Sequence, residues 1–317
     1  MEAPLRKAFH HSALWLIRLL PHEARRRIER RFRGWEEAEK LASADLVVIS
    51  FGKSGRTWLR VMISRFYQLN YGLEKEEMLG FDNLHRRESR IPRILFTHDN
   101  YLKDYTGQSD SKIDYQGKRI VLLVRNPKDV AVSLFFQWKH RMRPAKKFIN
   151  RYPAHGADVS LHDFVMSDLW GLPRVINFLN LWAEEAPKFD DLLIVRYEDM
   201  RANPETEFGR IMTFIGESVA EEIIRDVVEY ASVENMRKQE ENNDSRFASG
   251  RMKPGQRGVR DSYKVRRAKV GGYRDYFSPE QIETIDALVA STLASDYRYD
   301  SDRGESADES SESVAGR

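Results

Sequence analysis

Hydrophobic positions along this chain follow two alternating patterns. Short runs that are apolar throughout are typical of strands buried on both faces of a sheet. Segments in which apolar residues recur every three or four positions are typical of helices that pack on one side. The strand-like runs are residues 45–51, 93–98, 118–125 and 191–197, and helices are expected at residues 56–71, 173–187, 204–215 and 219–230 and from positions 127 and 278 onward. This alternation predicts the α/β class, as a single domain with a central, mainly parallel sheet flanked by helices.

Less regular segments lie between and around these elements. We expect two short helices within residues 9–33, a short helix at residues 74–79 and a loop or lid at residues 141–161. Residues 246–274 contain five glycines and are expected to form a flexible loop. The predicted boundaries are an N-terminal helical basic arm at residues 1–43, one large domain at residues 44–296 and a disordered acidic tail at residues 297–317.

Composition narrows the classes of protein that fit. The 317 residues are 41% hydrophobic, as in ordinary globular proteins, and the formal net charge is only +3, so binding to nucleic acid is not expected. Residues 246–274 nevertheless hold ten Lys or Arg against the single acid Asp261. The chain has no cysteine, which excludes disulfides and thiolate metal sites and is typical of a reducing compartment. Arg18 and Pro21 interrupt the apolar N-terminal segment, and no run approaches the roughly 20 apolar residues of a membrane span, so we expect a cytoplasmic protein.

The first strand-to-helix junction carries a candidate anion site. Residues 52–59 read G-K-S-G-R-T-W-L directly after the strand, and the helical pattern begins behind them. A tight loop of this kind directs backbone N–H groups and the positive end of a helix toward one point, and Lys53 adds a full charge. A phosphate or sulfate group is the expected ligand. The usual ATP or GTP loop requires a glycine where this chain has Val47, but a nucleotide or small-molecule kinase stays open as an alternative.

A second junction places an arginine at the end of another predicted strand. Arg125 closes the run at residues 118–125, and Ser133 follows eight residues later in the next helix. A guanidinium group and a hydroxyl group are well suited to bind a phosphate dianion. Ligands of open α/β sheets bind outside the carboxyl ends of the strands. One crevice is therefore expected to collect residues 53–57, His98, Arg125, Ser133 and Tyr197.

These junctions resemble the nucleotide-binding motifs of sulfotransferases that use 3′-phosphoadenosine-5′-phosphosulfate (PAPS). The 5′-phosphosulfate loop of that family is usually P-K-S-G-T-T-W-L, and residues 52–59 match it except that Gly52 replaces the proline and Arg56 replaces a threonine. The family's 3′-phosphate motif places an arginine at a strand end and a serine eight residues later, as Arg125 and Ser133 stand here. The resemblance implies a P-loop-like sulfotransferase fold with PAPS as cosubstrate.

Two further segments are similar to parts of that family that contact adenine. Residues 196–200 read R-Y-E-D-M, a segment whose tyrosine, here Tyr197, contacts the base. Residues 232–236 read S-V-E-N-M, with Val233 where the family often has an aromatic residue. Stacking on that side would be weaker, which leaves Trp58 as the better platform for the base.

The basic loop near the C-terminus also resembles a family motif. Residues 265–274 are similar to the R-K-G-x-x-G-D-W loop that closes over the nucleotide, with Arg266 and Arg267 at its two cations. Ala268 replaces the first glycine, so a positive φ there would be strained. The nucleotide-binding residues that the resemblance implies are Lys53, Ser54, Gly55, Arg56, Thr57, Trp58, Arg125, Ser133, Tyr197, Arg266, Arg267 and Ala268.

The resemblance also implies a reaction, the transfer of a sulfuryl group from PAPS to a hydroxyl group of an alcohol, phenol, lipid or glycan acceptor. In many members the general base is the histidine of K-T-H. Thr97 and His98 match the last two residues of that motif, whereas Phe96 replaces the lysine. Arg56 is a candidate to supply the cation that is lost with this lysine. Lys53 is expected to stabilise the leaving phosphate oxygen. No metal ion is required, because the transferred group carries one negative charge rather than the crowded charges of a polyphosphate.

One further alternative stays open beside the kinase. Phe96, Val233 and Ala268 depart from the family pattern, which favours a non-catalytic nucleotide-binding protein at a membrane surface. The apolar segment and arginine cluster of residues 15–33 are typical of an interfacial membrane anchor, although an arm packed on the domain with a solvated basic face explains the same pattern. The oligomeric state is left open.

Overall fold

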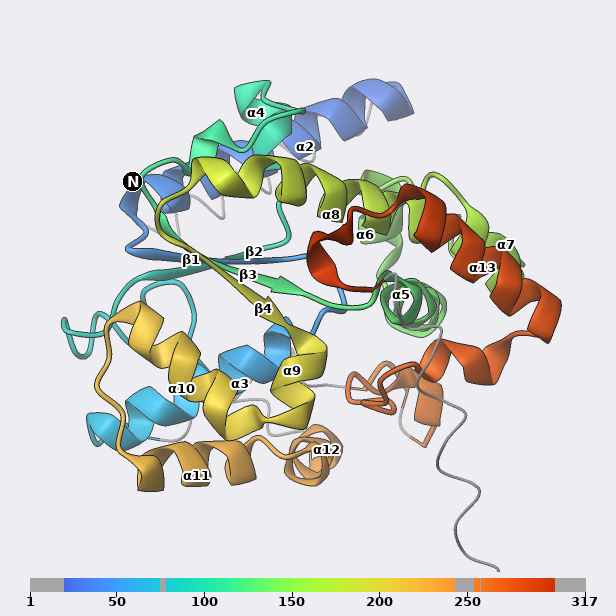
Figure 1. Cartoon of the computed structure of the whole chain (residues 1–317). Helices are drawn as coiled ribbons and strands as arrows, with labels where there is room; N and C mark the ends of the chain where they lie inside the picture. Colours follow the sequence, from blue (N-terminus) through green and yellow to red (C-terminus); the bar gives the residue numbers. More distant parts are fainter. Residues whose placement is uncertain (1–19, 75–77, 243–253, 257, 300–317) are drawn as a thin grey trace, which may run out of the picture.

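The computed structural model describes residues 20–74, 78–242, 254–256 and 258–299. Within these residues four strands form one parallel sheet in the order β2-β1-β3-β4 (Figure 1). The strands are β1 (Leu46–Ser50), β2 (Ile94–Thr97), β3 (Arg119–Val124) and β4 (Leu192–Arg196). This arrangement confirms the expected α/β class with a central parallel sheet flanked by helices.

Both faces of the sheet are covered, which explains why its strands are apolar throughout. Along β1, Val47 and Ile49 pack into one hydrophobic cluster, while Leu46 and Val48 pack into the other. Successive strand residues point to opposite faces, so an uninterrupted apolar run is required when neither face meets water. All four of these side chains are at most 1% exposed.

Helices form a layer on each side of the sheet (Figure 1). One layer contributes to the cluster around Val47 and contains α2 (His22–Ser43), α5 (Pro127–His140), α7 (Leu161–Met166), α8 (Leu172–Glu185) and α13 (Pro279–Thr292). The other contributes to the cluster around Val48 and contains α3 (Arg56–Asn70), α9 (Tyr197–Ala202), α10 (Pro204–Ile215), α11 (Glu221–Tyr230) and α12 (Val233–Asn242). The shorter elements are α4 (Leu102–Thr106), α6 (Pro144–Ile149), η2 (Ile113–Tyr115), η3 (Ala186–Lys188), η4 (Arg260–Ser262), η5 (Gly272–Tyr276) and η6 (Ser295–Tyr297).

The helix starts that the sequence predicts most sharply are confirmed. Asn126 caps α5 by accepting from the backbone N–H of Lys128, with proline in the first turn. Ser278 and Gln281 form a reciprocal capping box at the start of α13. In both cases a polar side chain satisfies an N–H group that the first turn of the helix cannot pair.

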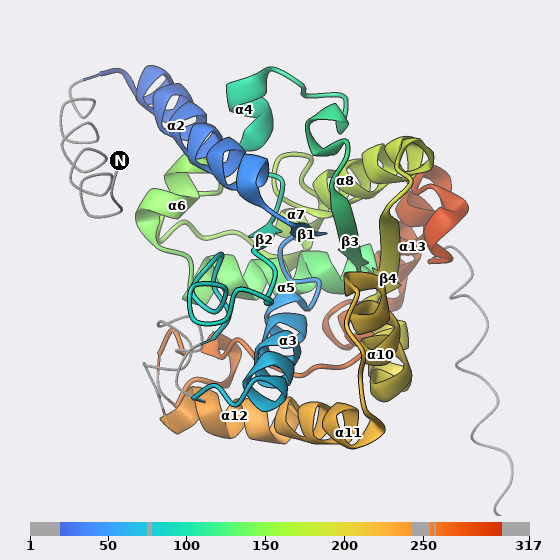
Figure 2. The same ribbon diagram turned by 90° about the vertical axis from the view of Figure 1, so that its left-hand side faces the viewer.

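The arm expected as two short helices is one helix over its described part. Residues 9–19 lie outside the described residues, and α2 runs without a break from residue 22 to residue 43. It lies against α4 and α6 (Figure 2). Arg26 donates to the Phe148 carbonyl oxygen, and Arg30 donates to Asp104 and to the Asn100 carbonyl oxygen. These contacts favour an arm packed on the domain, and no helix of the described residues is long and apolar enough to cross a membrane.

Several other expectations differ from the structure or lie partly outside the described residues. Residues 75–77 of the expected short helix lie outside the described residues, and the described residues on either side of them are not helical. The expected loop at residues 141–161 contains α6, and the helices α9 and α12 were not expected. Part of the basic loop, residues 246–253 and 257, lies outside the described residues. Tyr297 and Tyr299, assigned to the tail, are buried, and their hydroxyl groups donate to the Leu179 carbonyl oxygen and to Glu198.

Candidate active site

The loop between β1 and α3 has a sharply turned backbone. Lys53 and Gly55 have φ values of 78° and 95°, and Gly55 is the N-cap residue of α3. A Cβ atom at position 55 would lie 2.6 Å from Cδ2 of Tyr197, so only glycine allows the loop to approach that ring. Lys53 and Thr57 face a cavity, whereas Ser54 is buried behind the loop. The loop therefore brings the positive end of α3 and a lysine to the same cavity, as expected for an anion site.

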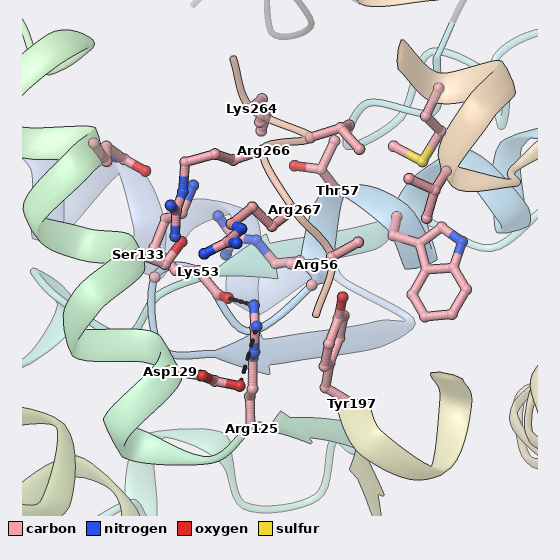
Figure 3. Close-up of a pocket in the computed structure, with 18 of the residues that line it drawn as sticks. Lys53, Arg56, Thr57, Arg125, Asp129, Ser133, Tyr197, Lys264, Arg266 and Arg267 are labelled. Atoms are coloured by element: carbon pink, nitrogen blue, oxygen red, sulfur yellow. Dashed lines mark hydrogen bonds and ion pairs between the residues drawn. The ribbon is translucent and has the colours of Figure 1, made fainter. Parts of the chain in front are cut away.

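Arg125 connects this loop to the end of β3. Its Nη1 donates to the Lys53 carbonyl oxygen at 3.2 Å, and its guanidinium group lies 4.2 Å from the centre of the Tyr197 ring (Figure 3). Its Nη2 lies 3.5 Å from a carboxylate oxygen of Asp129. Arg125 Nε is buried and has no hydrogen-bond partner among the described residues. Buried N–H groups are nearly always paired, so this arrangement fits an anionic ligand that accepts from Arg125.

Asp129 is a site residue that the sequence analysis missed. Its two carboxylate oxygens accept from the backbone N–H groups of Gly271 and Tyr273, both at 2.9 Å. It stands four residues before Ser133 on α5, so these two side chains share one face of the helix, and Arg125 lies just before the helix begins. That spacing was visible in the sequence, but the partners of Asp129 were not. Asp129 therefore holds the basic loop against the helix that carries Ser133.

Glu240 of α12 fixes the other end of the same loop. Its carboxylate is fully buried and accepts from the backbone N–H groups of Lys264 at 2.6 Å and Val265 at 3.0 Å. Arg141 Nη1 donates to it at 2.8 Å. A buried carboxylate requires such donors. No local pattern in the sequence indicates this role, because each partner is at least 24 residues away.

Two aromatic rings form a corner at one end of the cavity. The ring centres of Trp58 and Tyr197 lie 5.8 Å apart with an interplanar angle of 72°. Val233 and Met236 of α12 also line the cavity. Arg125 lies over one face of Tyr197 at 4.2 Å and Arg201 over one face of Trp58 at 5.6 Å, so a third planar ring would have to pack on the opposite face or against a ring edge. The corner can thus accept a nucleobase, with aliphatic side chains from α12 nearby.

His98 follows β2 and faces the same cavity. Its Nδ1 lies 2.9 Å from the Ser50 carbonyl oxygen, and its Nε2 lies 2.7 Å from Arg56 Nη2. A carbonyl oxygen only accepts and a guanidinium group only donates, so Nδ1 carries the proton and Nε2 presents its lone pair. Burial lowers the pKa of His98 well below its usual value, and the charges of Arg56 and Lys146 lower it further. The imidazole is therefore neutral near pH 7 and can accept a proton at Nε2.

One cavity of about 430 Å³ collects these side chains. Among the expected nucleotide-binding residues, all except Ser54 line it, together with His98. Asp129 is the only carboxylate among the described lining residues, and no described group of three or more His, Asp or Glu could hold a metal ion. The cationic lining residues are Lys53, Arg56, Arg60, Arg125, Lys146, Arg201, Lys264, Arg266, Arg267 and Lys269.

These cations make protonation of the buried lysines unfavourable. Burial lowers the pKa of Lys53 to about 7, and the charges of Arg141 and Arg125 contribute after it. Burial also lowers the pKa of Lys264 well below its usual value, with the charge of Lys53 as the next cause. A bound anion would raise both pKa values again, because it stabilises the protonated amines. The cavity is therefore electrostatically suited to an anionic ligand.

Ala268 has the strained backbone that the sequence analysis foresaw for a positive φ. Its φ is 52°, a conformation that glycine adopts readily and alanine rarely. We expect Ala268→Gly to raise the free energy of unfolding by about 0.5–1 kcal/mol, because the gain from relieved strain exceeds the added freedom of the unfolded chain. Urea denaturation measures the change. The control Ala294→Gly, at a φ of −58°, should lower the free energy of unfolding, and equal changes at both positions would contradict the assignment of strain.

Comparison with known families gives a match over most of the chain. The family model described as "Sulfotransferase domain" matches residues 43–296. Cytosolic sulfotransferase 13 of Arabidopsis thaliana is 26% identical over 282 residues, which cover 81% of this chain and 79% of the relative. Sulfotransferase 1B1 of Mus musculus is 27% identical over 293 residues, which cover 82% of this chain and 87% of the relative.

Two solved structures are similar in fold. A mouse sulfotransferase, SULT7A1, in complex with PAP aligns with a TM-score of 0.53 at 19% identity, covering 81% of this chain and 89% of the other. Retinol dehydratase in complex with androsterone and the inactive cofactor PAP aligns with a TM-score of 0.54 at 18% identity, covering 78% of this chain and 80% of the other. At these identities the similarity concerns the fold.

Proposed function

This chain belongs to the sulfotransferase domain family, and from that premise we propose that it transfers a sulfuryl group from PAPS to a hydroxyl group of an alcohol, phenol, lipid or glycan acceptor. The enzyme class, a PAPS-dependent sulfotransferase, follows from the family and its relatives. The acceptor and the residue roles are our inference. The main support for these roles is the position of His98. Its Nε2, which presents a lone pair, lies in the same cavity as Lys53 and Arg125.

The donor would be held by residues from three strand-to-helix junctions and the basic loop. The turned loop of residues 53–57 would bind the 5′-phosphosulfate through backbone N–H groups, the Lys53 amine and the Thr57 hydroxyl. The aromatic corner of Trp58 and Tyr197 would hold adenine. The 3′-phosphate would accept from Arg125, Ser133, Arg266 and Arg267, with Ala268 in the backbone that closes over the nucleotide. The unpaired Nε of Arg125 and the lowered pKa of Lys53 support this placement.

Sulfuryl transfer then requires one proton acceptor and one stabilised leaving group. As the acceptor oxygen bonds to sulfur, its proton passes to His98 Nε2, and the bond between sulfur and the 5′-phosphate oxygen breaks. The electron pair of that bond remains on the phosphate oxygen, where the Lys53 ammonium group stabilises the developing charge. The products are a sulfate ester, 3′-phosphoadenosine 5′-phosphate (PAP) and protonated His98. Arg56 must leave Nε2 before the acceptor hydroxyl can take its place.

A binding and transfer experiment tests the function. We expect purified protein to bind PAP in calorimetry and to move the label of ³⁵S-PAPS to members of a mixed phenol and alcohol panel without added Mg²⁺. A parallel assay supplies ATP and Mg²⁺ with the same acceptors. Transfer from ATP without PAP binding would support the kinase alternative. PAP binding with neither transfer nor hydrolysis of PAPS would support the non-catalytic alternative.

Two further proposals concern the cellular location of the protein and the division of its chain into a catalytic domain and added segments. A cytoplasmic location is supported by relatives whose names describe them as cytosolic. We propose that residues 1–43 and the acidic C-terminal residues are additions to a catalytic domain that begins at about residue 44. Contact of the arm with a membrane is not needed to explain α2, whose arginines bind neighbouring segments.

A further inference from the structure

The residue before His98 is bound by a side chain from the N-terminal arm. Thr97 ends β2, and its hydroxyl group donates to a carboxyl oxygen of Glu37. Glu37 belongs to α2 and lies outside residues 43–296, which the family model matches. The Thr97 hydroxyl oxygen also accepts from the backbone N–H of Asp99 at 2.8 Å. A side chain of the arm thus reaches the turn that carries the proposed base.

The turn at residues 97–99 sets the direction of the imidazole. Asp99 has a φ of 53°, a left-handed conformation that aspartate adopts more readily than most residues. The hydrogen bond from the Asp99 N–H to the Thr97 side chain closes the turn around His98. Nδ1 of His98 then reaches the Ser50 carbonyl oxygen at 2.9 Å, and the ring lines the cavity. A rotation of this turn would displace both ring nitrogens together.

The far side of the turn is anchored by the domain itself. Lys112 Nζ donates to one carboxylate oxygen of Asp99 at 2.5 Å, and the Tyr115 hydroxyl group donates to the other at 3.0 Å. All three residues are buried, and a buried carboxylate with two donors is held firmly. On the near side, the partner of the Thr97 hydroxyl outside the turn, among the described residues, is Glu37.

The arm helix packs closely enough to keep Glu37 in place. At Gly34, one turn before Glu37, an added Cβ atom would lie 2.3 Å from the Tyr101 carbonyl oxygen, so only glycine permits this approach. One further turn back, Arg30 donates to the Asn100 carbonyl oxygen at 2.7 Å. Positions 30, 34 and 37 share one face of an α-helix. This face of α2 therefore contacts the chain on both sides of the proposed base.

We propose that Glu37 is a positioning residue for His98, because its hydrogen bond with Thr97 holds the turn at residues 97–99 in the orientation that directs Nε2 toward the acceptor hydroxyl. This inference rests on the proposed sulfuryl transfer with His98 as the base, and it makes α2 part of the catalytic unit. Glu37 acts through Thr97, since it is not among the described residues that line the cavity.

The contact requires an acceptor oxygen rather than a negative charge. Burial raises the pKa of Glu37 to about 7, so both of its protonation states are populated near neutral pH. Each state has a carboxyl oxygen that accepts from the Thr97 hydroxyl group. Glutamine has the same length and also offers such an oxygen, whereas alanine offers none.

Variants at Glu37 test this role. We expect Glu37→Ala to lower kcat for transfer from ³⁵S-PAPS by about 10- to 100-fold, because a misplaced base slows proton transfer. The KM for PAPS and the affinity for PAP in calorimetry should change by about twofold or less, since other elements bind the donor. Glu37→Gln should retain at least about a third of kcat. The control Glu39→Ala, at an exposed position of the same helix, should leave kcat unchanged.

A double variant connects the effect to Thr97. Thr97→Val preserves the shape of the side chain and removes its hydroxyl group, so it should lower kcat at least as much as Glu37→Ala does. The double variant should be slower than Thr97→Val by about twofold or less, because both substitutions break the same hydrogen bond. Independent contributions would instead multiply.

The combined results separate positioning of the base from a general structural role. A loss of kcat that glutamine restores, at unchanged PAP affinity, supports the inference. It would be overturned by full kcat in Glu37→Ala, by no recovery with glutamine, by equal losses of kcat and PAP affinity, or by multiplied losses in the double variant. An unaltered protein that binds no PAP or sulfates no acceptor would instead contradict the proposed function, so the two failures are distinguishable.

Discussion

Replacing His98 with alanine is expected to lower kcat for sulfuryl transfer by about 10²- to 10⁴-fold, while the affinity for PAP changes by about twofold or less. The structure gives the reason. Nδ1 of His98 is tied to the Ser50 carbonyl oxygen, which leaves Nε2 as the proton acceptor at the cavity. Without it the acceptor hydroxyl must lose its proton to water. Stopped-time assays with ³⁵S-PAPS measure kcat, and calorimetry measures the affinity for PAP.

The pH profile of the unaltered protein provides a second readout. A general base must be unprotonated to act, and burial, Arg56 and Lys146 lower the pKa of His98 well below its usual value of about 6.5. At saturating PAPS, where the bound anion keeps Lys53 protonated, kcat should therefore stay constant as the pH falls to about 6.5 and decline only below it. The His98→Ala variant should show no such acid limb.

A control variant shows whether the loss of kcat is specific to His98. His162→Ala removes a histidine that packs edge-on against Phe277 and does not line the cavity, so its kcat should equal that of the unaltered protein. If His98→Ala retained full kcat, another group would have to accept the proton. A loss of PAP affinity equal to the loss of kcat would indicate a structural role instead.

The parts of the site that could be predicted from sequence are those determined locally. A buried strand, a glycine-containing turn and the first turn of a helix follow one another along the chain, so the loop that carries Lys53 could be located from its own residues. The same holds for Arg125 and Ser133. The backbone strain at Ala268 could be foreseen as well. The family motif has glycine there, which indicates a positive φ, and the φ of Ala268 is 52°.

The parts that could not be predicted depend on contacts between distant segments. Glu240 and Asp129 hold the basic loop through backbone N–H groups, which every residue has and which therefore leave no signal in the sequence. Arg56 is a similar case, since its neighbour His98 is 42 residues away. The family resemblance indicated that Phe96 replaces a lysine and that Arg56, which stands in place of a threonine, is a candidate substitute for that cation. The structure shows in addition that Arg56 donates to Nε2 of His98, the atom that we propose as the proton acceptor.

These contacts connect the fold to the proposed chemistry. Ser50 ends β1 and His98 follows β2, which are neighbours in the sheet, so strand pairing itself sets the orientation of the imidazole. Arg125 follows β3, which pairs with the other side of β1, and it donates to the loop that β1 carries. The central position of β1 thus places the proton acceptor on one side of the Lys53 loop and the proposed phosphate site on the other.

Replacing Lys53 with methionine is expected to lower kcat by about 10²- to 10³-fold, because the 5′-phosphate oxygen then leaves without a cation beside it. Methionine keeps a Cβ atom at a residue whose φ is 78°, so the backbone strain of the loop is similar in both proteins. A glycine at this position would change strain and charge together. Single-turnover assays with ³⁵S-PAPS separate the chemical step from release of PAP.

The affinity for PAP should also depend on pH in a way that identifies Lys53. Burial and nearby cations lower its pKa to about 7 in the free protein, so above that pH the amine loses its proton, and an anion must bind together with a proton. PAP affinity should therefore fall as the pH rises above 7 in the unaltered protein. The fall should be much smaller in Lys53→Met, while the control Lys238→Met, at an exposed lysine of α12 that is paired with Glu234, keeps the original dependence. Retention of full kcat by Lys53→Met, or of the same pH dependence, would show that another cation stabilises the leaving oxygen.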